Sequence, residues 1–271
     1  MKGANFIHMN RIDTRFAELK REGRKALITF LTVGDPTVEV SAEAIKTMDA
    51  EGVDLIELGV PFSDPAADGA TIQEADERAL AHGTDIHKVF DMAAEIRGEV
   101  KAPMVFLLYY NVMLQYGLEA FFKRCAETGI DGLIIPDLPY EESGEIAGYV
   151  EKYNVYQIFL VSPASRERIE KIASNAKGFL YCVSSLGVTG EKAEFKTDFE
   201  NFFRDIKKYS NVPACVGFGI SNGEQVRELS SYCDGAIVGS AVVKAIASGN
   251  TTEERMSNLK AKIRELKTGI E

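Results

Sequence analysis

Three carboxylic acids stand close together in the segment ELGVPFSDPAADG, which covers residues 57–69. Glu57 lies in the apolar run DLIELGV, where a carboxylate is costly unless it is paired or used in a reaction. Asp64 and Asp68 follow in the polar part of the segment. Two carboxylates in different environments can divide the roles of acid and base between them. The alternative is a solvated loop beside a paired glutamate, the commoner situation for isolated carboxylates.

Glycine-rich turns follow three later apolar runs, in the segments SSLGVTGE, VGFGIS and IVGSAV. Glycine lets the backbone approach a ligand closely, and backbone N–H groups at a helix N-terminus bind anions. Ser221 and Ser240 stand where the next helices are expected to begin. Each turn alone is common, but the three together predict a phosphate site.

Several other chemistries are disfavoured by where their residues stand. His8, His82 and His87 fall in predicted helices or linkers, so a histidine-ligated metal is not expected. Lys25 and Lys177 precede predicted strands, which is the wrong end of a barrel for a Schiff base. No predicted strand carries a cysteine or serine with a histidine to activate it. Carboxylate acid–base chemistry on a small phosphorylated substrate remains.

Eight short apolar runs alternate with amphipathic helical patterns and would position these residues. Runs that are apolar throughout are typical of strands in a parallel sheet. Eight β/α units without a linker predict an α/β fold, a single (β/α)8 barrel over residues 1–271, with a doubly wound sheet as the alternative. The runs are residues 26–32, 54–59, 104–110, 132–136, 155–161, 179–184, 214–217 and 235–238.

Two additions to a bare barrel are expected. Ile12, Phe16 and Leu19 predict a helix before the first strand, which would cap the bottom of the barrel. More than forty residues separate the second and third strands, enough for an extra helix over residues 86–96 and a long loop over residues 60–69. Long loops in compact domains are often functional.

A repeated pattern and three strand-end residues complete the barrel prediction. Gly52-Val53-Asp54 and Gly129-Ile130-Asp131 each close a helix and open a strand, and Cys233-Asp234 resembles them. Barrel active sites lie at the carboxyl ends of the strands. Besides Glu57, this end would receive Asp137, Tyr109 and Tyr181. Asp137 is equally expected to cap the next loop, and either tyrosine can be a plain core residue.

Composition excludes several classes of protein. Lys and Arg total 31 against 41 Asp and Glu, a formal charge of −10, without a basic cluster that would attract nucleic acid. No apolar stretch is long enough to span a membrane, and the first residues lack the apolar core of a signal peptide. Four widely spaced cysteines, Cys125, Cys182, Cys215 and Cys233, are typical of reduced thiols in the cytoplasm.

Five segments occur in one order along nearly the whole chain: FLTVGDP, ELGVPFSDPAADGATIQ, GVTG, GFGIS and VGSA. In these segments the sequence resembles the tryptophan synthase alpha chain family. The resemblance implies a single-domain barrel that cleaves indole-3-glycerol phosphate by a retro-aldol reaction, giving indole and glyceraldehyde 3-phosphate. It also implies that the chain needs no metal or organic cofactor.

The resemblance assigns roles to individual residues. Glu57 is the implied acid that protonates indole C3, and its carboxylate then takes the proton of the glycerol hydroxyl. Asp68 is the implied acceptor of the indole N–H, and Tyr181 positions the substrate and the acid. The implied pocket residues are Phe30, Leu107, Tyr109, Leu160 and Phe218. The implied phosphate cradle is Gly190, Gly219, Gly239 and Ser240, with Thr189 closing over Asp68.

The sequence departs from the family pattern at two positions. Lys192 follows GVTG where many members carry an arginine, and Pro136 stands where others have alanine and is expected to reshape the pocket wall. The family also implies a partner, the pyridoxal phosphate-dependent beta chain, in a heterotetramer. Asp64, Asn111 and Pro139 match positions at that contact, and the cofactor belongs to the partner.

Three other functions are weighed against a partner-activated alpha chain. A stand-alone lyase with the same site would gain no rate from a beta chain. A silent subunit that only activates its partner is disfavoured by intact Glu57 and Asp68. Another phosphate-binding barrel, such as a sugar-phosphate isomerase, would explain the glycines but not the ELGVPFSDP segment.

Overall fold

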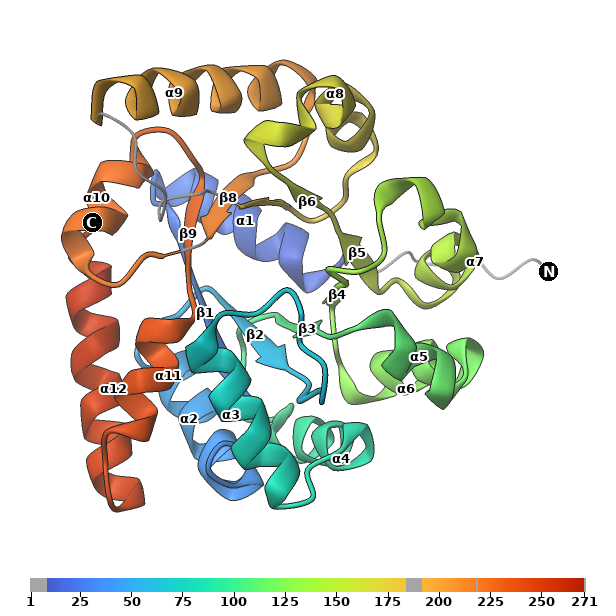
Figure 1. Cartoon of the computed structure of the whole chain (residues 1–271), viewed down its shortest axis with the longest axis vertical. Coiled ribbons are helices and arrows are strands. Elements are labelled where there is room, and N and C mark those ends of the chain that lie inside the picture. Colours follow the sequence, from blue (N-terminus) through green and yellow to red (C-terminus); the bar gives the residue numbers. More distant parts are fainter. Residues whose placement is uncertain (1–8, 184–191, 218, 271) are drawn as a thin grey trace.

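The apolar runs form parallel strands around a common axis, with helices outside them (Figure 1). The structure is a computed structural model and describes residues 9–183, 192–217 and 219–270. All strand pairings in these residues are parallel. The strands are β1 (Ala26–Thr32), β2 (Leu55–Gly59), β3 (Met104–Leu107), β4 (Gly132–Ile134), β5 (Tyr156–Ile158), β6 (Leu160–Val161), β7 (Leu180–Val183), β8 (Ala214–Gly217) and β9 (Gly235–Val238).

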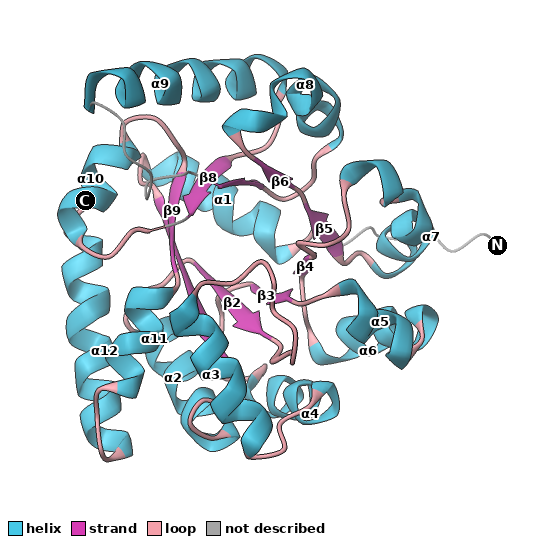
Figure 2. Cartoon of the chain, in the orientation of Figure 1, coloured by secondary structure: helices cyan, strands magenta, loops and turns pink. Residues whose placement is uncertain are grey.

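The strand order closes the sheet into a barrel. It reads β5-β4-β3-β2-β1-β9-β8-β7-β6, so β5 and β6 stand at opposite ends of the row. Only Phe159 separates them in the chain, and the row therefore bends round on itself (Figure 2). The predicted strand 155–161 is wrong as a single strand, because β5 pairs with β4 while β6 pairs with β7. The barrel prediction is confirmed, and the doubly wound alternative is wrong.

Helices cover the outside of the barrel, and four of those described exceed a bare β/α repeat, because α1 precedes β1 and two helices each follow β2, β3 and β9. The helix before the first strand, α1, and the extra helix over residues 86–96, α4, are confirmed. The predicted strand 104–110 is wrong beyond Leu107, because Asp137 caps the N–H of Tyr110 (2.9 Å) and a short helix begins there. The helices are α1 (Arg11–Glu22), α2 (Val38–Ala50), α3 (Ala70–Ala81), α4 (Ile86–Ile96), α5 (Tyr110–Tyr116), α6 (Leu118–Thr128), α7 (Gly144–Tyr153), α8 (Arg166–Asn175), α9 (Lys192–Tyr209), α10 (Gly223–Ser230), α11 (Ser240–Ala247) and α12 (Thr252–Lys267).

Helix α1 closes the amino-terminal end of the barrel. Its buried residues Ile12, Phe16 and Leu19 pack into one core with inward-facing strand residues, and the Phe16 and Phe179 rings are 5.8 Å apart. A separate, larger core lies between the strands and the surrounding helices. Apolar side chains thus fill the amino-terminal end of the barrel, and the polar groups of a site are expected at its carboxyl-terminal end.

The repeated aspartates join neighbouring strands at this closed end. Gly52 and Gly129 adopt left-handed backbone angles, φ +79° and +73°, where the preceding helices stop. Asp54, Asp131 and Asp234 then each accept a backbone N–H from the adjacent strand. The donors are Leu27, Met104 and Ala214, at 2.7, 3.0 and 3.0 Å.

Asp54 accepts the most side-chain hydrogen bonds of the three, because Arg15 (2.6 Å) and Arg24 (2.9 and 3.0 Å) also donate to it, and its own side chain is 1% exposed. We expect Asp54→Ala to lower the free energy of unfolding by about 3 kcal/mol, since two guanidinium groups and one buried N–H lose their acceptor. Urea denaturation at neutral pH measures this. Glu99→Ala, which removes an exposed pair with Lys46, is the control and should cost less than about 1 kcal/mol. Equal losses would contradict the role of Asp54.

Candidate functional site

A cavity of about 860 Å³ opens at the carboxyl ends of the strands. Strands on opposite sides of the barrel contribute to its wall, together with the turns after β8 and β9 and the loop after β2. It is large enough for a bicyclic ring carrying a phosphorylated side chain. The residues expected at the site that line it are Phe30, Glu57, Asp68, Leu107, Pro136, Leu160, Tyr181, Gly219, Gly239 and Ser240.

Glu57 occupies the apolar side of this cavity. It sits in β2 in register with Phe30 of β1 and Val105 of β3, so the backbone is fixed on both sides. The residue is 1% exposed, and neither carboxyl oxygen has a hydrogen-bond partner among the described residues. Burial raises the pKa of Glu57 from 4.5 to about 8. The carboxyl group therefore carries its proton at neutral pH.

Asp68 stands in a more polar environment on the loop after β2. The Tyr109 hydroxyl donates to Asp68 Oδ2 (2.8 Å) and accepts the N–H of Ala67 (2.9 Å), which fixes the carboxyl group. Burial raises the pKa of Asp68, and the Tyr109 hydroxyl opposes that shift. Tyr109 thus contributes to the site by holding Asp68 in place. Its ring stacks on that of Phe62, with the ring centroids 4.9 Å apart.

Tyr181 faces the cavity from β7, across the barrel from Glu57. Burial raises the pKa of Tyr181 well above its ordinary value, and the carboxyl groups of Glu57 and Asp68 add to this effect. Glycine at position 217 on β8 leaves room for its hydroxyl group, because a Cβ built at Gly217 would lie 2.6 Å from Tyr181 Oη. Tyr181 is consequently a neutral hydroxyl group close to both acids.

The glycine turns meet at one end of the cavity. Gly219 has φ +77°, in the left-handed region that favours glycine. Gly239 precedes α11, and no side chain caps the N-terminus of that helix. Ser240 begins the helix, and all three residues line the cavity. Uncapped N–H groups at a helix N-terminus are suited to a phosphate group.

Three ionisable residues near the cavity were not predicted from the sequence. Lys244 and Lys262 line the cavity. Asp76 of α3 is 5% exposed, and burial together with the charge of Asp68 raises its pKa to about 7. Lys244 follows Ser240 by four residues, one helical turn, and that spacing was a usable signal. Lys262 lies on α12, a later helix, and no spacing in the sequence indicates that it would reach the cavity.

The residues expected at a partner contact lie on the same end of the molecule. Asp64, Asn111 and Pro139 are exposed and follow β2, β3 and β4. Asp137, for which capping of the next loop was the alternative, instead accepts the N–H of Tyr110 at the start of α5, a helix that precedes it in the chain. Thr189, Gly190 and Phe218 lie outside the described residues, as does the side chain of Lys192.

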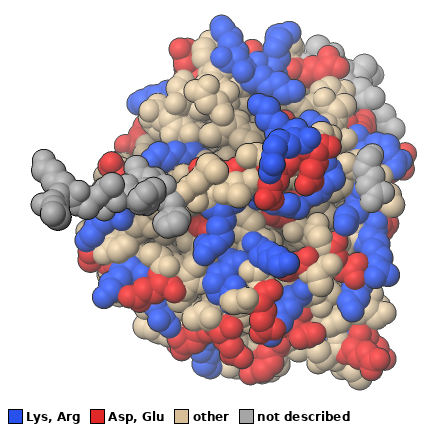
Figure 3. All heavy atoms as spheres, turned by 180° about the vertical axis from the view of Figure 1, so that it is seen from behind, with Lys and Arg blue, Asp and Glu red and all other residues tan. Residues whose placement is uncertain are grey.

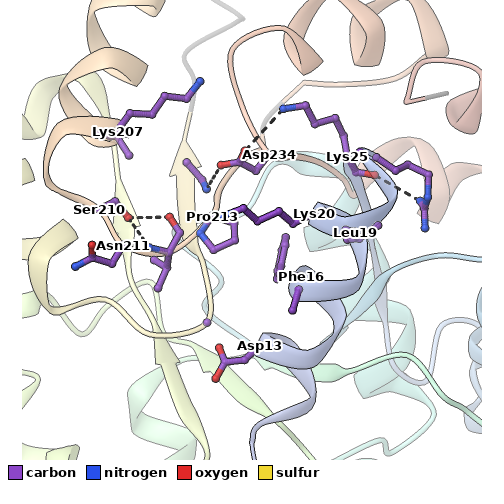
Figure 4. Close-up of a pocket in the computed structure, with 17 residues that line it drawn as sticks. Asp13, Phe16, Leu19, Lys20, Lys25, Lys207, Ser210, Asn211, Pro213 and Asp234 are labelled. Carbon is purple, nitrogen blue, oxygen red and sulfur yellow. Dashed lines mark hydrogen bonds and ion pairs between the residues drawn. The ribbon is translucent and has the colours of Figure 1, made fainter.

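A second hollow of about 630 Å³ lies at the opposite, amino-terminal end of the barrel, beside α1 (Figure 4). Its two acids serve the fold: Asp13 accepts the Tyr156 hydroxyl (2.8 Å), and Asp234 accepts the N–H of Ala214 and pairs with Lys25 (3.7 Å). None of its acids is both buried and unpaired. The carboxyl-end cavity is therefore the candidate active site.

Charged side chains and possible metal ligands are dispersed over the described part of the chain. Basic and acidic side chains are interspersed on the face shown in Figure 3, without a continuous basic stripe. In the part of the chain that the structure describes, no group of three His, Cys, Asp or Glu side chains could hold a metal ion. No described helix is long and apolar enough to cross a bilayer. All four cysteines are free and buried.

Comparison with known proteins identifies one family. The sequence profile described as "Tryptophan synthase alpha chain" matches residues 16–271. A tryptophan synthase alpha chain from Caldanaerobacter subterraneus is 48% identical over 93% of this chain and 96% of its own. A tryptophan synthase structure from M. tuberculosis superposes with a TM-score of 0.87 at 32% identity, covering 97% of this chain and 99% of that one. Tryptophan synthase subunit alpha from Campylobacter jejuni gives 0.84 at 36% identity, covering 92% and 98%.

The buried acid predicts a pH-dependent gain in stability for Glu57→Gln. Between pH 4.5 and about 8 the folded protein retains a proton that the unfolded chain has released, so wild-type stability falls as pH rises. The variant lacks this titration. Its free energy of unfolding, minus that of wild type, should rise by about 1.4 kcal/mol per pH unit across this window. Urea titrations at pH 5, 6, 7 and 8, values spanning that window, measure the slope; a flat difference would contradict the buried, protonated state.

Proposed function

Because this chain belongs to the tryptophan synthase alpha chain family, it is a carbon–carbon lyase of tryptophan synthesis, and we propose that Glu57 and Asp68 carry its cleavage step. The reaction splits indole-3-glycerol phosphate into indole and glyceraldehyde 3-phosphate. One observation carries the proposal: Glu57 is a buried acid without a hydrogen-bond partner among the described residues, at the wall of the cavity, with a pKa of about 8.

The first step is proton transfer to the indole ring. The ring has no carbonyl group to accept electrons, so C3 must be protonated before its bond to the glycerol carbon C1′ can break. Glu57 donates this proton, and positive charge develops at the ring nitrogen. Asp68, held by Tyr109, accepts the ring N–H and stabilises that charge. General acid catalysis by one positioned group contributes about 10²–10⁴-fold.

The second step breaks the carbon–carbon bond. The electron pair of the C3–C1′ bond returns to the ring and restores neutral indole. The C1′ hydroxyl group passes its proton to the Glu57 carboxylate, and C1′ becomes the aldehyde of glyceraldehyde 3-phosphate. Glu57 ends protonated, as it began, so the cycle needs no further reactant.

The remaining cavity residues bind and orient the substrate in this proposal. Tyr181 positions the glycerol part and the acid, and the side chains of Phe30, Leu107 and Leu160 enclose the indole ring. Gly219, Gly239 and Ser240 bind the phosphate group, joined by Gly190. Phe218 and Thr189 complete the indole pocket and the cover over Asp68. Support comes from the uncapped start of α11 and the left-handed backbone of Gly219.

The proposal includes a partner and a location. Alpha chains of this family need no cofactor themselves. We propose that a beta chain carrying pyridoxal phosphate docks over the cavity, contacts Asp64, Asn111 and Pro139, and receives indole directly in a heterotetramer of two alpha and two beta chains. The whole chain then acts as one barrel domain in the cytoplasm, a location supported by four free thiols.

Indole release from indole-3-glycerol phosphate tests the function. We expect slow release by the chain alone and a rate higher by orders of magnitude after mixing with a purified beta chain. Glu57→Gln should abolish release in both conditions while indole binding persists, because the amide cannot donate an acidic proton. Near-normal turnover of the variant would refute the role of Glu57. Fast release that the partner does not change would identify a stand-alone lyase.

Gly219→Asp tests the phosphate site. A carboxylate beside the substrate phosphate should raise KM at least about tenfold, because like charges in contact cost several kcal/mol. Gly219 has a left-handed backbone, so Gly219→Ala is the control that adds strain without charge. Its rise in KM should be smaller. An unchanged KM in the aspartate variant would move the phosphate site elsewhere.

A further inference from the structure

The turn after β8 is held from outside the barrel by α12, the last helix, which lies beside α11 (Figure 1). Lys262 Nζ donates to the carbonyl oxygen of Ser221 (3.2 Å), and Glu265 Oε1 accepts the N–H of Gly223 (3.0 Å). The two side chains pair with each other at 2.6 Å. One ion pair therefore binds two backbone groups of the turn at once.

Backbone packing brings the same two segments into direct contact. A Cβ built at Gly223 would lie 2.4 Å from the carbonyl oxygen of Glu265. A Cβ built at Gly269 would lie 2.3 Å from the carbonyl oxygen of Gly223. Since both positions admit only glycine, the position of α12 determines where the turn can lie.

Other contacts fix the far side of the turn. The N–H and hydroxyl groups of Ser221 both donate to Gln225 Oε1, at 2.8 and 3.0 Å. Asn222 Oδ1 accepts the N–H of Gln225 (2.9 Å) and caps α10. Residues 221–223 are thus held from both α10 and α12, while Gly219, two residues earlier, faces the cavity.

We propose that Lys262 and Glu265 form a clamp on the phosphate-binding turn and act as positioning residues for the phosphate group of the substrate, an inference that rests on the proposed function. The clamp keeps the backbone of Gly219 in the orientation that a phosphate ester requires. Lys262 itself lines the cavity, so its positive charge also faces that end. A lysine ammonium has three N–H donors, of which Ser221 and Glu265 use two.

The charge state of the clamp is stable at neutral pH. Burial raises the pKa of Glu265, but the hydrogen bonds from Lys262 and the Gly223 N–H outweigh it and bring the pKa below its ordinary value. Glu265 is therefore ionised when the site binds its ligand. An anionic Glu265 holds Lys262 in place and keeps the acceptor for Gly223.

The test separates the two halves of the cavity by their two products. Dissociation constants for glyceraldehyde 3-phosphate and for indole are measured with the full chain and with Glu265→Gln and Lys262→Met. We expect the glyceraldehyde 3-phosphate constant to rise about threefold to tenfold in each variant, as for the net loss of one ordinary hydrogen bond, with indole binding unchanged. KM should rise in parallel while kcat stays close to wild type. Lys262→Arg, which retains the charge and the donors, should restore most of the binding.

Glu51→Gln is the matched control, because it removes a carboxylate that pairs with α12 through Arg264 (2.8 Å) and does not line the cavity. It should change neither dissociation constant. Equal weakening of indole and glyceraldehyde 3-phosphate, an unchanged glyceraldehyde 3-phosphate constant, or the same effect in Glu51→Gln would overturn the clamp. Wild-type protein that binds neither product would instead refute the proposed function, and the clamp with it.

Discussion

Desolvation of Glu57 is the constraint that most of the structure serves. A carboxyl group without a hydrogen-bond partner costs about 1–3 kcal/mol when it is buried neutral, and more when it is charged. Such a group stays in place only where the backbone cannot move to hydrate it. Parallel pairing with β1 and β3 supplies that rigidity, because Glu57 is in register with Phe30 on one side and Val105 on the other.

The same short segment shows how environment alone separates two acids. Asp54 immediately precedes β2, and Glu57, three residues later, is the middle residue of that strand. Asp54 accepts from Leu27, Arg15 and Arg24 at the closed end of the barrel, where ionised groups join strands and helix α1. Glu57 meets no cation among the described residues and keeps its proton. Around β2, the ionised carboxylate thus stabilises the closed end of the barrel, while the protonated one faces the cavity.

The local sequence pattern correctly predicted those strands and helices whose first and last residues are determined by residues close to them in the sequence. The strands at 26–32, 214–217 and 235–238 and the helix at 86–96 lie where periodicity and turn residues put them. The break at Phe159 could not be predicted, because it arises where the chain changes partner from β4 to β7. The early end of β3 depends on Asp137, 27 residues away from Tyr110.

The candidate site likewise contains residues that the sequence predicted and contacts that it could not predict. Residue types singled out Glu57 and Asp68, but the Tyr109 contact that makes their environments unequal spans 41 residues. The Lys262 contact with Ser221 also spans 41 residues and joins an amphipathic surface helix to a glycine turn. Hydrophobic periodicity reports which face of α12 is buried, at Met256, Leu259 and Ile263, and says nothing of what its polar side chains reach.

The two ends of the cavity are therefore positioned by different means. Strands fix the acid proposed to act on the indole ring, whereas turns and a terminal helix fix the groups proposed to bind phosphate. Binding energy from a remote phosphate group can be used to retain the substrate in the cavity beside its acid. A rigidly held Glu57 benefits from this binding energy only if the turn proposed to bind phosphate is held as rigidly. The Lys262–Glu265 pair meets that requirement from α12, a helix outside the strands of the barrel.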